Sequence, residues 1–262
     1  MERLALAKAV VAGRIPPIRS TDAAQRPTAL FYPGLPGRHF YDPNEFAWAA
    51  ELRSHFAAIS AELDATLHAR RGFEPIFPAH SDSGHWAGLW FYLYGRRYDA
   101  NCASFPRTLK ALAQVPRAAG WACLSAMAPG SHVTAHCGAT NAKLRLHFSL
   151  RSDEGSMMRV ADDYYEWRQG EIMIFDDSYE HEVWVAGQSP RVVLIVDFYH
   201  PDLTDEEVAF LTEFETLPTP LTRNRSLREL YTNAAATFGG DPRAVSPDWL
   251  YDAENQRTPA TD

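Results

Sequence analysis

Apolar residues recur along the chain with two different spacings, three to four residues in some segments and two in others. These spacings predict helices around a central block of strands. Between positions 42 and 72 the apolar residues recur at steps of three and four, which is typical of a helix that covers a sheet. Asp42 is expected to cap this helix, with Pro43 at its first position and Glu45 closing a capping box. The expected buried stripe consists of Leu52, Phe56, Ile59, Leu63 and Leu67.

From Trp121 onward the apolar residues alternate with polar ones, which indicates strands. Along residues 143–150, for example, Leu146 and Phe148 alternate with Arg145 and His147, so one face of the strand is apolar and the other polar. Many short strands separated by turn residues favour a jelly roll or barrel, so we expect a mainly β fold with flanking helices. The expected strands are residues 90–94, 122–127, 144–150, 157–160, 164–167, 171–175, 181–185 and 191–199.

Composition divides the chain into three parts. Residues 1–40 are rich in proline and predict an irregular arm across the surface. Residues 41–215 form the expected main domain, which ends with a helix opened by a capping box of Thr204 and Glu207. Residues 216–262 are interpreted as a C-terminal extension that is partly helical.

Three smaller elements complete the interpretation. Residues 73–88 are expected to be a loop and residues 106–115 a short helix. In the C-terminal extension a helix is predicted over residues 227–238, and the polar end from residue 254 is expected to be disordered.

Composition also narrows the partners. The net charge is −8 and no basic stripe stands out, so we expect no binding to nucleic acid. The three cysteines cannot form a disulfide framework, and the short apolar run at the N-terminus is too short to span a bilayer. A cytoplasmic protein that acts on a small molecule or a peptide is therefore expected.

Two histidines, His136 and His181, are the first candidates for chemistry. Neutral imidazole binds divalent iron, and iron oxygenases often combine two histidines with one carboxylate. That carboxylate usually stands two residues after the first histidine, where this chain has Gly138. One alternative is that water fills the position, and another is that the two histidines are ordinary loop residues. The nearest acids that could replace the carboxylate are Asp176, Asp177 and Glu180.

Arg191 is the first candidate for binding an anion. It begins an otherwise apolar strand, where a buried guanidinium is costly unless it meets a negative charge. A guanidinium matches a carboxylate in bidentate fashion, so a dicarboxylate cosubstrate could dock here. We expect a hairpin turn at residues 187–190 to place Arg191 beside the strand of His181. The alternative is an exposed arginine at the rim of the sheet.

Neighbouring polar residues extend this hypothesis. Lys143, Arg145 and His147 share one face of their predicted strand and would favour an anionic ligand, unless that face is simply exposed to solvent. Asp176 or Asp177 could orient His181 through its second ring nitrogen, although both also suit a turn.

Taken together, these blocks resemble the aspartyl/asparaginyl β-hydroxylase family over about residues 32–207. The resemblance also includes Gly84-x-Trp86 and Gly95-Arg96-Arg97. The other blocks are His136-x-Gly138-x-Thr140-Asn141, Leu144-Arg145-Leu146-His147, Gly170-Glu171-x-x-Ile174-Phe175-Asp176-Asp177-Ser178-x-Glu180-His181-Glu182-Val183-Trp184 and Arg191-x-x-Leu194-Ile195-Val196-Asp197-x-x-His200-Pro201.

The resemblance implies a double-stranded β-helix of the cupin-like jelly-roll type, with Fe(II), O2 and the cosubstrate 2-oxoglutarate. It implies that His136 and His181 hold the metal without a carboxylate. Cosubstrate contacts are implied for Ser125, His147 and Arg191, and substrate contacts for Trp86, Lys143 and Arg145. Lys143 departs from the arginine of the family. The family's paired cysteines are not kept, because Cys102 matches one of them and Leu109 stands where the other would be.

The expected activity is hydroxylation of an amino-acid unit, free, carrier-bound or within a peptide, that presents an anionic or amide group. One alternative keeps the same cofactors and acts on an acyl or lipid-type substrate. Another is a non-catalytic double-sheet module that binds metal.

Overall fold

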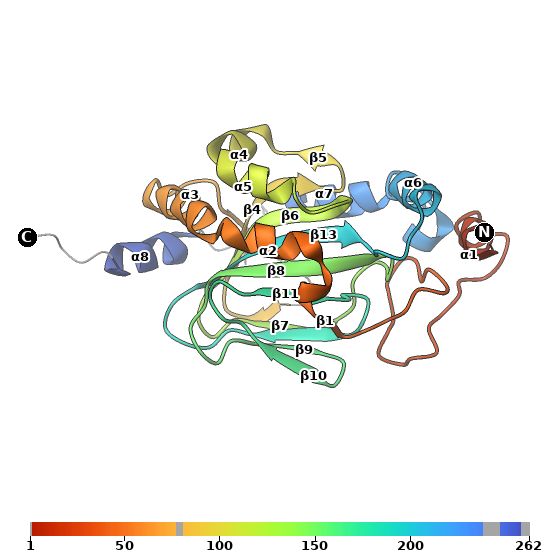
Figure 1. Cartoon of the computed structure of the whole chain (residues 1–262), viewed down its shortest axis with the longest axis horizontal. Helices are drawn as coiled ribbons and strands as arrows, with labels where there is room; N and C mark the ends of the chain where they lie inside the picture. The colour runs from red at the N-terminus through yellow and green to blue at the C-terminus, as the bar shows by residue number, and fades with distance from the viewer. Residues whose placement is uncertain (1, 77–80, 238–246, 258–262) are drawn as a thin grey trace, which may run out of the picture.

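The computed structural model describes residues 2–76, 81–237 and 247–257, and in these the chain forms two antiparallel sheets. In spatial order the larger sheet contains β1 (Phe40–Tyr41), β11 (Ile172–Phe175), β8 (Lys143–Arg151), β13 (Arg191–Tyr199), β6 (Ala118–Met127), β4 (Trp86–Leu93) and β2 (Glu74–Pro75), with β5 (Arg96–Arg97) paired to β4. The smaller sheet contains β10 (Asp163–Glu166), β9 (Met157–Val160), β12 (His181–Trp184), β7 (His132–His136) and β3 (Ser81–Ser83). The two sheets form a double-stranded β-helix, so the predicted fold class is confirmed (Figure 1).

Both faces of the larger sheet are covered, as the alternating side chains of β8 show. Leu146 and Phe148 pack in one apolar core together with the helices. Arg145 and His147 have the opposite parity and face the second core, which the smaller sheet shares. Strand β13 is buried at every position, because a central strand between two covered faces has no solvent side. Polar groups on the inner face therefore enter the interior of the barrel.

The expected long helix is in fact two helices, α2 (Ala47–Ser54) and α3 (Phe56–His68), which meet at His55. Asp42 does act as a cap, but for the short 3-10 helix η1 (Pro43–Glu45). The capping box with Glu45 was wrong, because this carboxylate pairs with Arg38 at 2.8 Å. The predicted stripe is nevertheless buried against the larger sheet, apart from Phe56, which is only partly buried.

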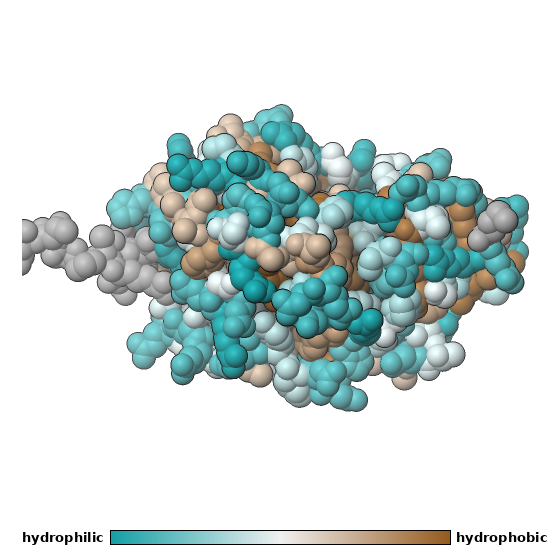
Figure 2. All heavy atoms as spheres, in the orientation of Figure 1, coloured by the Kyte–Doolittle hydropathy of each residue, from teal (hydrophilic) through white to brown (hydrophobic). Residues whose placement is uncertain are grey.

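Two further helices, α4 (Asp99–Ser104) and α5 (Pro106–Leu112), join α2 and α3 on the outer face of the larger sheet (Figure 1). The loop expected at 73–88 contains β2, β3 and the start of β4. Sequence alternation also missed β7, which is only five residues long. Figure 2 shows that hydrophilic side chains cover most of this face, with apolar atoms mainly in the gaps between them.

The two ends of the chain are more ordered than expected. The N-terminal arm begins with helix α1 (Glu2–Val11), which buries Leu4, Ala7 and Val10. Arg3 anchors it by an ion pair of 2.6 Å to Glu207 in α6 (Asp205–Phe214), and Figure 1 shows the two helices at the same end of the molecule. The capping box of Thr204 and Glu207 that opens α6 is confirmed.

The C-terminal extension contains a short 3-10 helix, η2 (Pro220–Thr222), and helices α7 (Leu227–Thr237) and α8 (Asp248–Arg257). The helix predicted at 227–238 is confirmed as far as Thr237, and Phe238 lies outside the described residues. Disorder from residue 254 was wrong up to Arg257, because α8 continues through it. In the described ranges, no helix has both the length and the apolarity needed to cross a bilayer.

Candidate active site

The two candidate histidines meet across neighbouring strands. His136 is the last residue of β7, His181 is the first residue of β12, and their Cα atoms are direct partners in the smaller sheet. Their ring centroids lie 4.1 Å apart. Residues 45 positions apart in the chain are therefore close enough to bind one ion.

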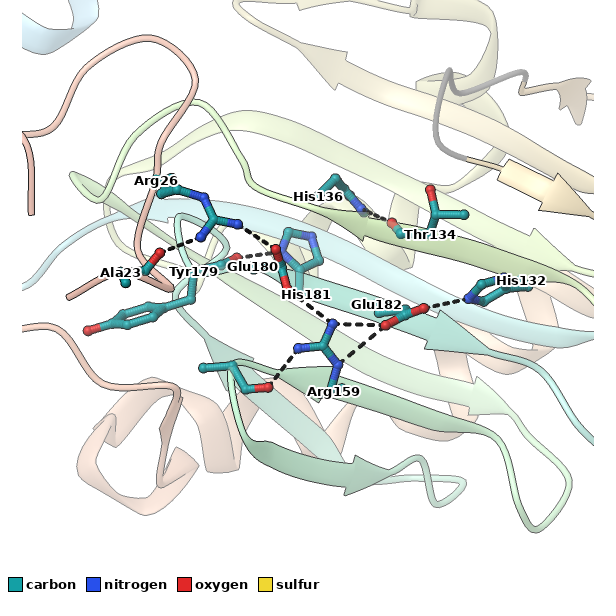
Figure 3. Close-up of polar contacts among 11 residues, drawn as sticks. Ala23, Arg26, His132, Thr134, His136, Arg159, Tyr179, Glu180, His181 and Glu182 are labelled. Carbon is teal, nitrogen blue, oxygen red and sulfur yellow. Dashed lines mark hydrogen bonds and ion pairs between the residues drawn. The ribbon is translucent and has the colours of Figure 1, made fainter.

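Each ring is oriented by the same local hydrogen bond. Nδ1 of His136 lies 2.8 Å from the carbonyl oxygen of Thr134, and Nδ1 of His181 lies 2.9 Å from that of Tyr179 (Figure 3). A carbonyl oxygen only accepts, so in these bonds Nδ1 carries the proton and Nε2 carries the lone pair. A backbone partner that fixes the tautomer is typical of metal-binding histidines. The expectation that Asp176 or Asp177 orients His181 was therefore wrong.

The acids considered as replacements for the missing carboxylate have other partners. Asp176 accepts hydrogen bonds from the Ser178 amide and the Gln25 side chain, and burial raises its pKa to about 8. Glu180 pairs with Arg26 and Arg159. Throughout the described residues, no group of three or more His, Cys, Asp or Glu is arranged to hold a metal ion. The candidate metal donors are thus the two imidazoles.

Gly138 leaves room for a neighbouring carboxylate. A Cβ atom at this position would lie 2.4 Å from Cγ of Asp177, well inside van der Waals contact. The Gly138 amide also donates to the Asp177 carbonyl oxygen at 2.6 Å. A side chain at position 138 would have to displace the Asp177 carboxylate from its present place.

Arg191 is buried inside the barrel, with 2 % of its surface exposed. Its Nε and Nη1 have no hydrogen-bond partner, and its guanidinium carbon lies 4.2 Å from the centre of the Trp167 ring. Burial lowers the pKa of Arg191 to about 9, because no anion offsets the loss of water. The alternative of an exposed rim arginine was wrong.

The route by which Arg191 reaches the interior differs from the prediction. Its strand, β13, pairs with β6 and β8 in the larger sheet, whereas β12 belongs to the smaller sheet. Residues 187–190 therefore form no hairpin and carry the chain from one sheet to the other. In a double-sheet fold, consecutive strands often lie in opposite sheets, and local turn residues do not reveal this.

Other polar atoms beside Arg191 are equally unsatisfied. Both ring nitrogens of His147, the hydroxyl of Ser149 and the indole nitrogen of Trp167 are buried without a hydrogen-bond partner. The His147 and Trp167 rings stack at 5.9 Å. Burial lowers the pKa of His147 well below its usual value, and the charges of Arg191 and Arg145 lower it further. His147 is thus a neutral imidazole at neutral pH.

Such groups are rare in folded proteins, because a buried unpaired donor costs about 1 to 3 kcal/mol. Arg191, Trp167 and Ser149 bring mainly donors into one region, which fits an anionic ligand with several acceptor oxygens. The side chains of Ser149 and Trp167 were missed in the sequence, where nothing distinguishes them from other strand and loop residues. Ser125 is buried nearby on β6 and accepts a hydrogen bond of 2.9 Å from the indole of Trp86.

The remaining predicted cations are paired within the protein. Lys143 lies 2.8 Å from Glu215, and Arg145 makes a bidentate pair with Asp197 at 2.7 and 2.9 Å. Arg145 is also 3.3 Å from Asp177. Asp197 and Glu215 were not among the predicted site residues, although an acid in the apolar strand 192–199 is itself a signal of a buried cation.

A separate ion-pair network runs along the smaller sheet. His132 binds Glu182 at 2.8 Å, Glu182 binds Arg159 at 2.8 Å, and Arg159 reaches Glu180 at 3.3 Å (Figure 3). Arg26 of the N-terminal arm completes the network at Glu180. The network joins β7, β12 and β9 and so supports the pairing that brings His136 and His181 together.

The N-terminal arm also braces the two loops that carry the histidines. The Thr28 amide donates to the carbonyl of Gly138, and the Glu180 amide donates to the carbonyl of Ala24. Gln25 bonds Asp176 and Ser178. The arm therefore forms part of the wall of the site.

The chain is similar to several known proteins. Residues 53–201 match the sequence pattern of the family described as aspartyl/asparaginyl beta-hydroxylase. The chain is 34 % identical over 185 residues to the human aspartyl/asparaginyl beta-hydroxylase, covering 66 % of this chain and 24 % of that protein. It is 35 % identical over 182 residues to the ornithine lipid ester-linked acyl 2-hydroxylase of Rhizobium tropici, covering 66 % of this chain and 64 % of that protein.

Among solved structures, one similar chain is an oxidoreductase of the 2OG-Fe(II) oxygenase family from Burkholderia pseudomallei. The match has a TM-score of 0.40 and 14 % identity, and it covers 63 % of this chain and 97 % of that one. Because this chain spans only about a quarter of the human relative, the activity of that whole protein does not transfer to it directly.

Proposed function

Because this chain belongs to the aspartyl/asparaginyl beta-hydroxylase family, we propose that it is an Fe(II)- and 2-oxoglutarate-dependent dioxygenase that hydroxylates an amino-acid unit, free, carrier-bound or within a peptide. The observation that carries the proposal is the combination of two paired histidines with a buried, unsatisfied guanidinium in the same interior.

His136 and His181 would hold the iron through Nε2, since Nδ1 of each ring is committed to a carbonyl oxygen. Imidazole nitrogen is a suitable donor for divalent iron. Together the bound iron and 2-oxoglutarate would supply the oxidising chemistry, in which O2 is consumed and succinate and carbon dioxide are released.

Arg191 would bind the far carboxylate of 2-oxoglutarate. This pairing would supply the anion that the buried guanidinium lacks and would satisfy its Nε and Nη1. His147 can donate one neutral hydrogen bond without adding charge, and Ser125 can contribute its hydroxyl. Ser149 and Trp167 are the additional donors that we assign to the same ligand. All of these groups lie in the buried interior, where water is excluded and charge pairing is strong.

Trp86, Lys143 and Arg145 remain the proposed contacts on the substrate side. Trp86 is partly buried next to Ser125, and Arg145 is more accessible than Lys143. An acyl or lipid-type substrate is the second candidate, and one observation favours it. Lys143 and Arg145 already have carboxylate partners within the chain, so neither is an obvious docking point for an acidic side chain.

The test is succinate release from 2-oxoglutarate by the purified protein with Fe(II) and O2, measured with peptide, amino-acid and acyl-lipid substrates. Calorimetry with Mn(II) in place of Fe(II) reports 2-oxoglutarate binding independently of turnover. Metal-dependent binding together with substrate-stimulated succinate release is expected. Metal binding without 2-oxoglutarate binding would instead favour the non-catalytic module.

A further inference from the structure

The polar side chains at the substrate end of the site form one cluster with an excess of acid. Besides its contact with Glu215, Lys143 lies 4.5 Å from the centre of the Tyr94 ring. Lys143 and Asp197 both approach Gly120, where a Cβ would lie 2.7 Å from Nζ of the lysine and 2.9 Å from Oδ2 of Asp197. The Trp121 amide donates to the same oxygen.

Arg145 belongs to the same cluster. It pairs with Asp197, the carboxylate that also lies near Lys143. It contacts Asp177 at 3.3 Å, and its guanidinium carbon lies 4.6 Å from the centre of the Trp121 ring. Two cations, Lys143 and Arg145, therefore face three carboxylates. Among these five side chains one negative charge is left over, and the nearby guanidinium of Arg228 is bonded to the Tyr94 carbonyl oxygen rather than to any of the three carboxylates. Arg191, by contrast, is a positive charge without an anion.

The cluster is shielded, so solvent does little to weaken this imbalance. Lys143 is 4 % exposed and Glu215 is 7 % exposed. Burial on its own would lower the pKa of Lys143, but the charges of Glu215 and Asp197 outweigh it and raise that pKa. Tyr231 of α7 stacks on Tyr94 at 4.8 Å and covers the cluster from the C-terminal extension.

We propose that the substrate group which reaches this end is uncharged or cationic, such as a carboxamide or an ammonium group, and that Glu215 is the residue that excludes a carboxylate. Glu215 occupies the partner position on Lys143 that a substrate carboxylate would otherwise take. A carboxylate would have to displace it or add a second surplus negative charge in a buried site, which is strongly unfavourable. This inference rests on the proposed function and specifies its substrate class.

The experiment uses two probes that differ only in charge, N-acetyl-aspartate α-amide and N-acetyl-asparagine α-amide. Each is titrated by calorimetry into the full-length protein loaded with Mn(II) and 2-oxoglutarate. The wild type is expected to bind the aspartate probe at least about tenfold more weakly than the asparagine probe. The Glu215→Gln variant should bind the aspartate probe about tenfold more tightly than the wild type does.

Two further variants make the result specific. Glu213→Gln removes a carboxylate from the exposed side of α6 two residues away and should leave both affinities unchanged. In the double variant Lys143→Met with Glu215→Leu, one cation still faces two carboxylates, so it should reject the aspartate probe as the wild type does. This variant also removes the buried unpaired lysine that could prevent Glu215→Gln from folding, which thermal unfolding would reveal.

Equal binding of both probes by the wild type would overturn the inference. The same holds if Glu215→Gln folds and gains no affinity for the aspartate probe. If Glu215→Gln does not fold, tight binding of the aspartate probe by the double variant overturns the inference instead. Failure of the wild type to bind 2-oxoglutarate would count against the proposed function. Equal binding of the two probes by a wild type that does bind 2-oxoglutarate would count only against the inferred substrate class and the role of Glu215.

Discussion

Two groups of polar residues differ in whether the chain itself supplies their hydrogen-bond or ion-pair partners. One group lies in the barrel interior, and the other is the charged network on the smaller sheet. Arg191 and His147 are buried with nitrogen atoms that have no hydrogen-bond partner. Arg159 and Glu182 are more accessible, yet each contacts oppositely charged side chains. The buried interior, where polar atoms cannot bond to water, is therefore the region whose polar atoms lack hydrogen-bond partners.

This difference separates a binding role from a structural one. Partly exposed ion pairs contribute about 0 to 1 kcal/mol each, so the network mainly holds strands in register. A buried guanidinium without an anion is costly, and a fold has no structural reason to keep it. The unsatisfied atoms of Arg191, His147, Ser149 and Trp167 are therefore where we propose that the ligand binds.

The largest effect is expected from the histidines of the smaller sheet. His136→Ala and His181→Ala should each abolish succinate release and greatly weaken Mn(II) binding, because no third protein ligand is available within the described residues. His132→Ala is the matched control, since His132 lies at the other end of β7 and belongs to the charged network. Full activity in either of the first two variants would remove that histidine from the metal site.

Arg191→Ala should raise the dissociation constant for 2-oxoglutarate sharply, by roughly 2 to 5 kcal/mol of lost charge pairing. Arg159→Ala removes an arginine of the network and should leave this constant unchanged. Calorimetric titration of both variants in the presence of Mn(II) provides the comparison. An unchanged constant for Arg191→Ala would mean that another cation binds the cosubstrate.

Gly138→Asp tests whether Asp177 prevents a carboxylate at position 138 from joining the two histidines. The added Cβ would clash with Asp177, so we expect a loss of about 1 to 3 kcal/mol in the free energy of unfolding. Combining it with Asp177→Gly should restore part of this loss, and urea unfolding measures both. An equally stable single variant would show that Asp177 can move aside at little cost.

The smallest effect concerns the pH dependence of the network. Burial on its own would lower the pKa of His132, but hydrogen bonds to Glu182 and Asp82 outweigh it and raise that pKa above 6.5. A histidine with a raised pKa stabilises the fold fully below its unfolded value and loses this contribution as pH rises through the folded value. Wild-type stability should therefore fall slightly as pH rises above 6.5, and His132→Asn should flatten this slope in urea unfolding. A variant with an unchanged slope would show that His132 remains neutral.

Local patterns along the chain were sufficient for much of the secondary structure. The alternation of apolar residues located β13 and β9 to the residue, and it placed β8 with an apolar and a polar face. The capping box of Thr204 and Glu207 likewise located the start of α6. These features depend on neighbours within a few positions, which the sequence displays directly.

The sequence also singled out the candidate residues for the chemistry, because the motifs around His136, His181 and Arg191 resemble those of one family. It could not reveal that Arg191 crosses to the other sheet, that Asp177 fills the space beside Gly138, or that Glu215 pairs with Lys143. These contacts join residues between 39 and 72 positions apart or depend on which sheet a strand enters. Only the tertiary structure decides them, because the charge balance of a buried site is set by side chains that folding brings together.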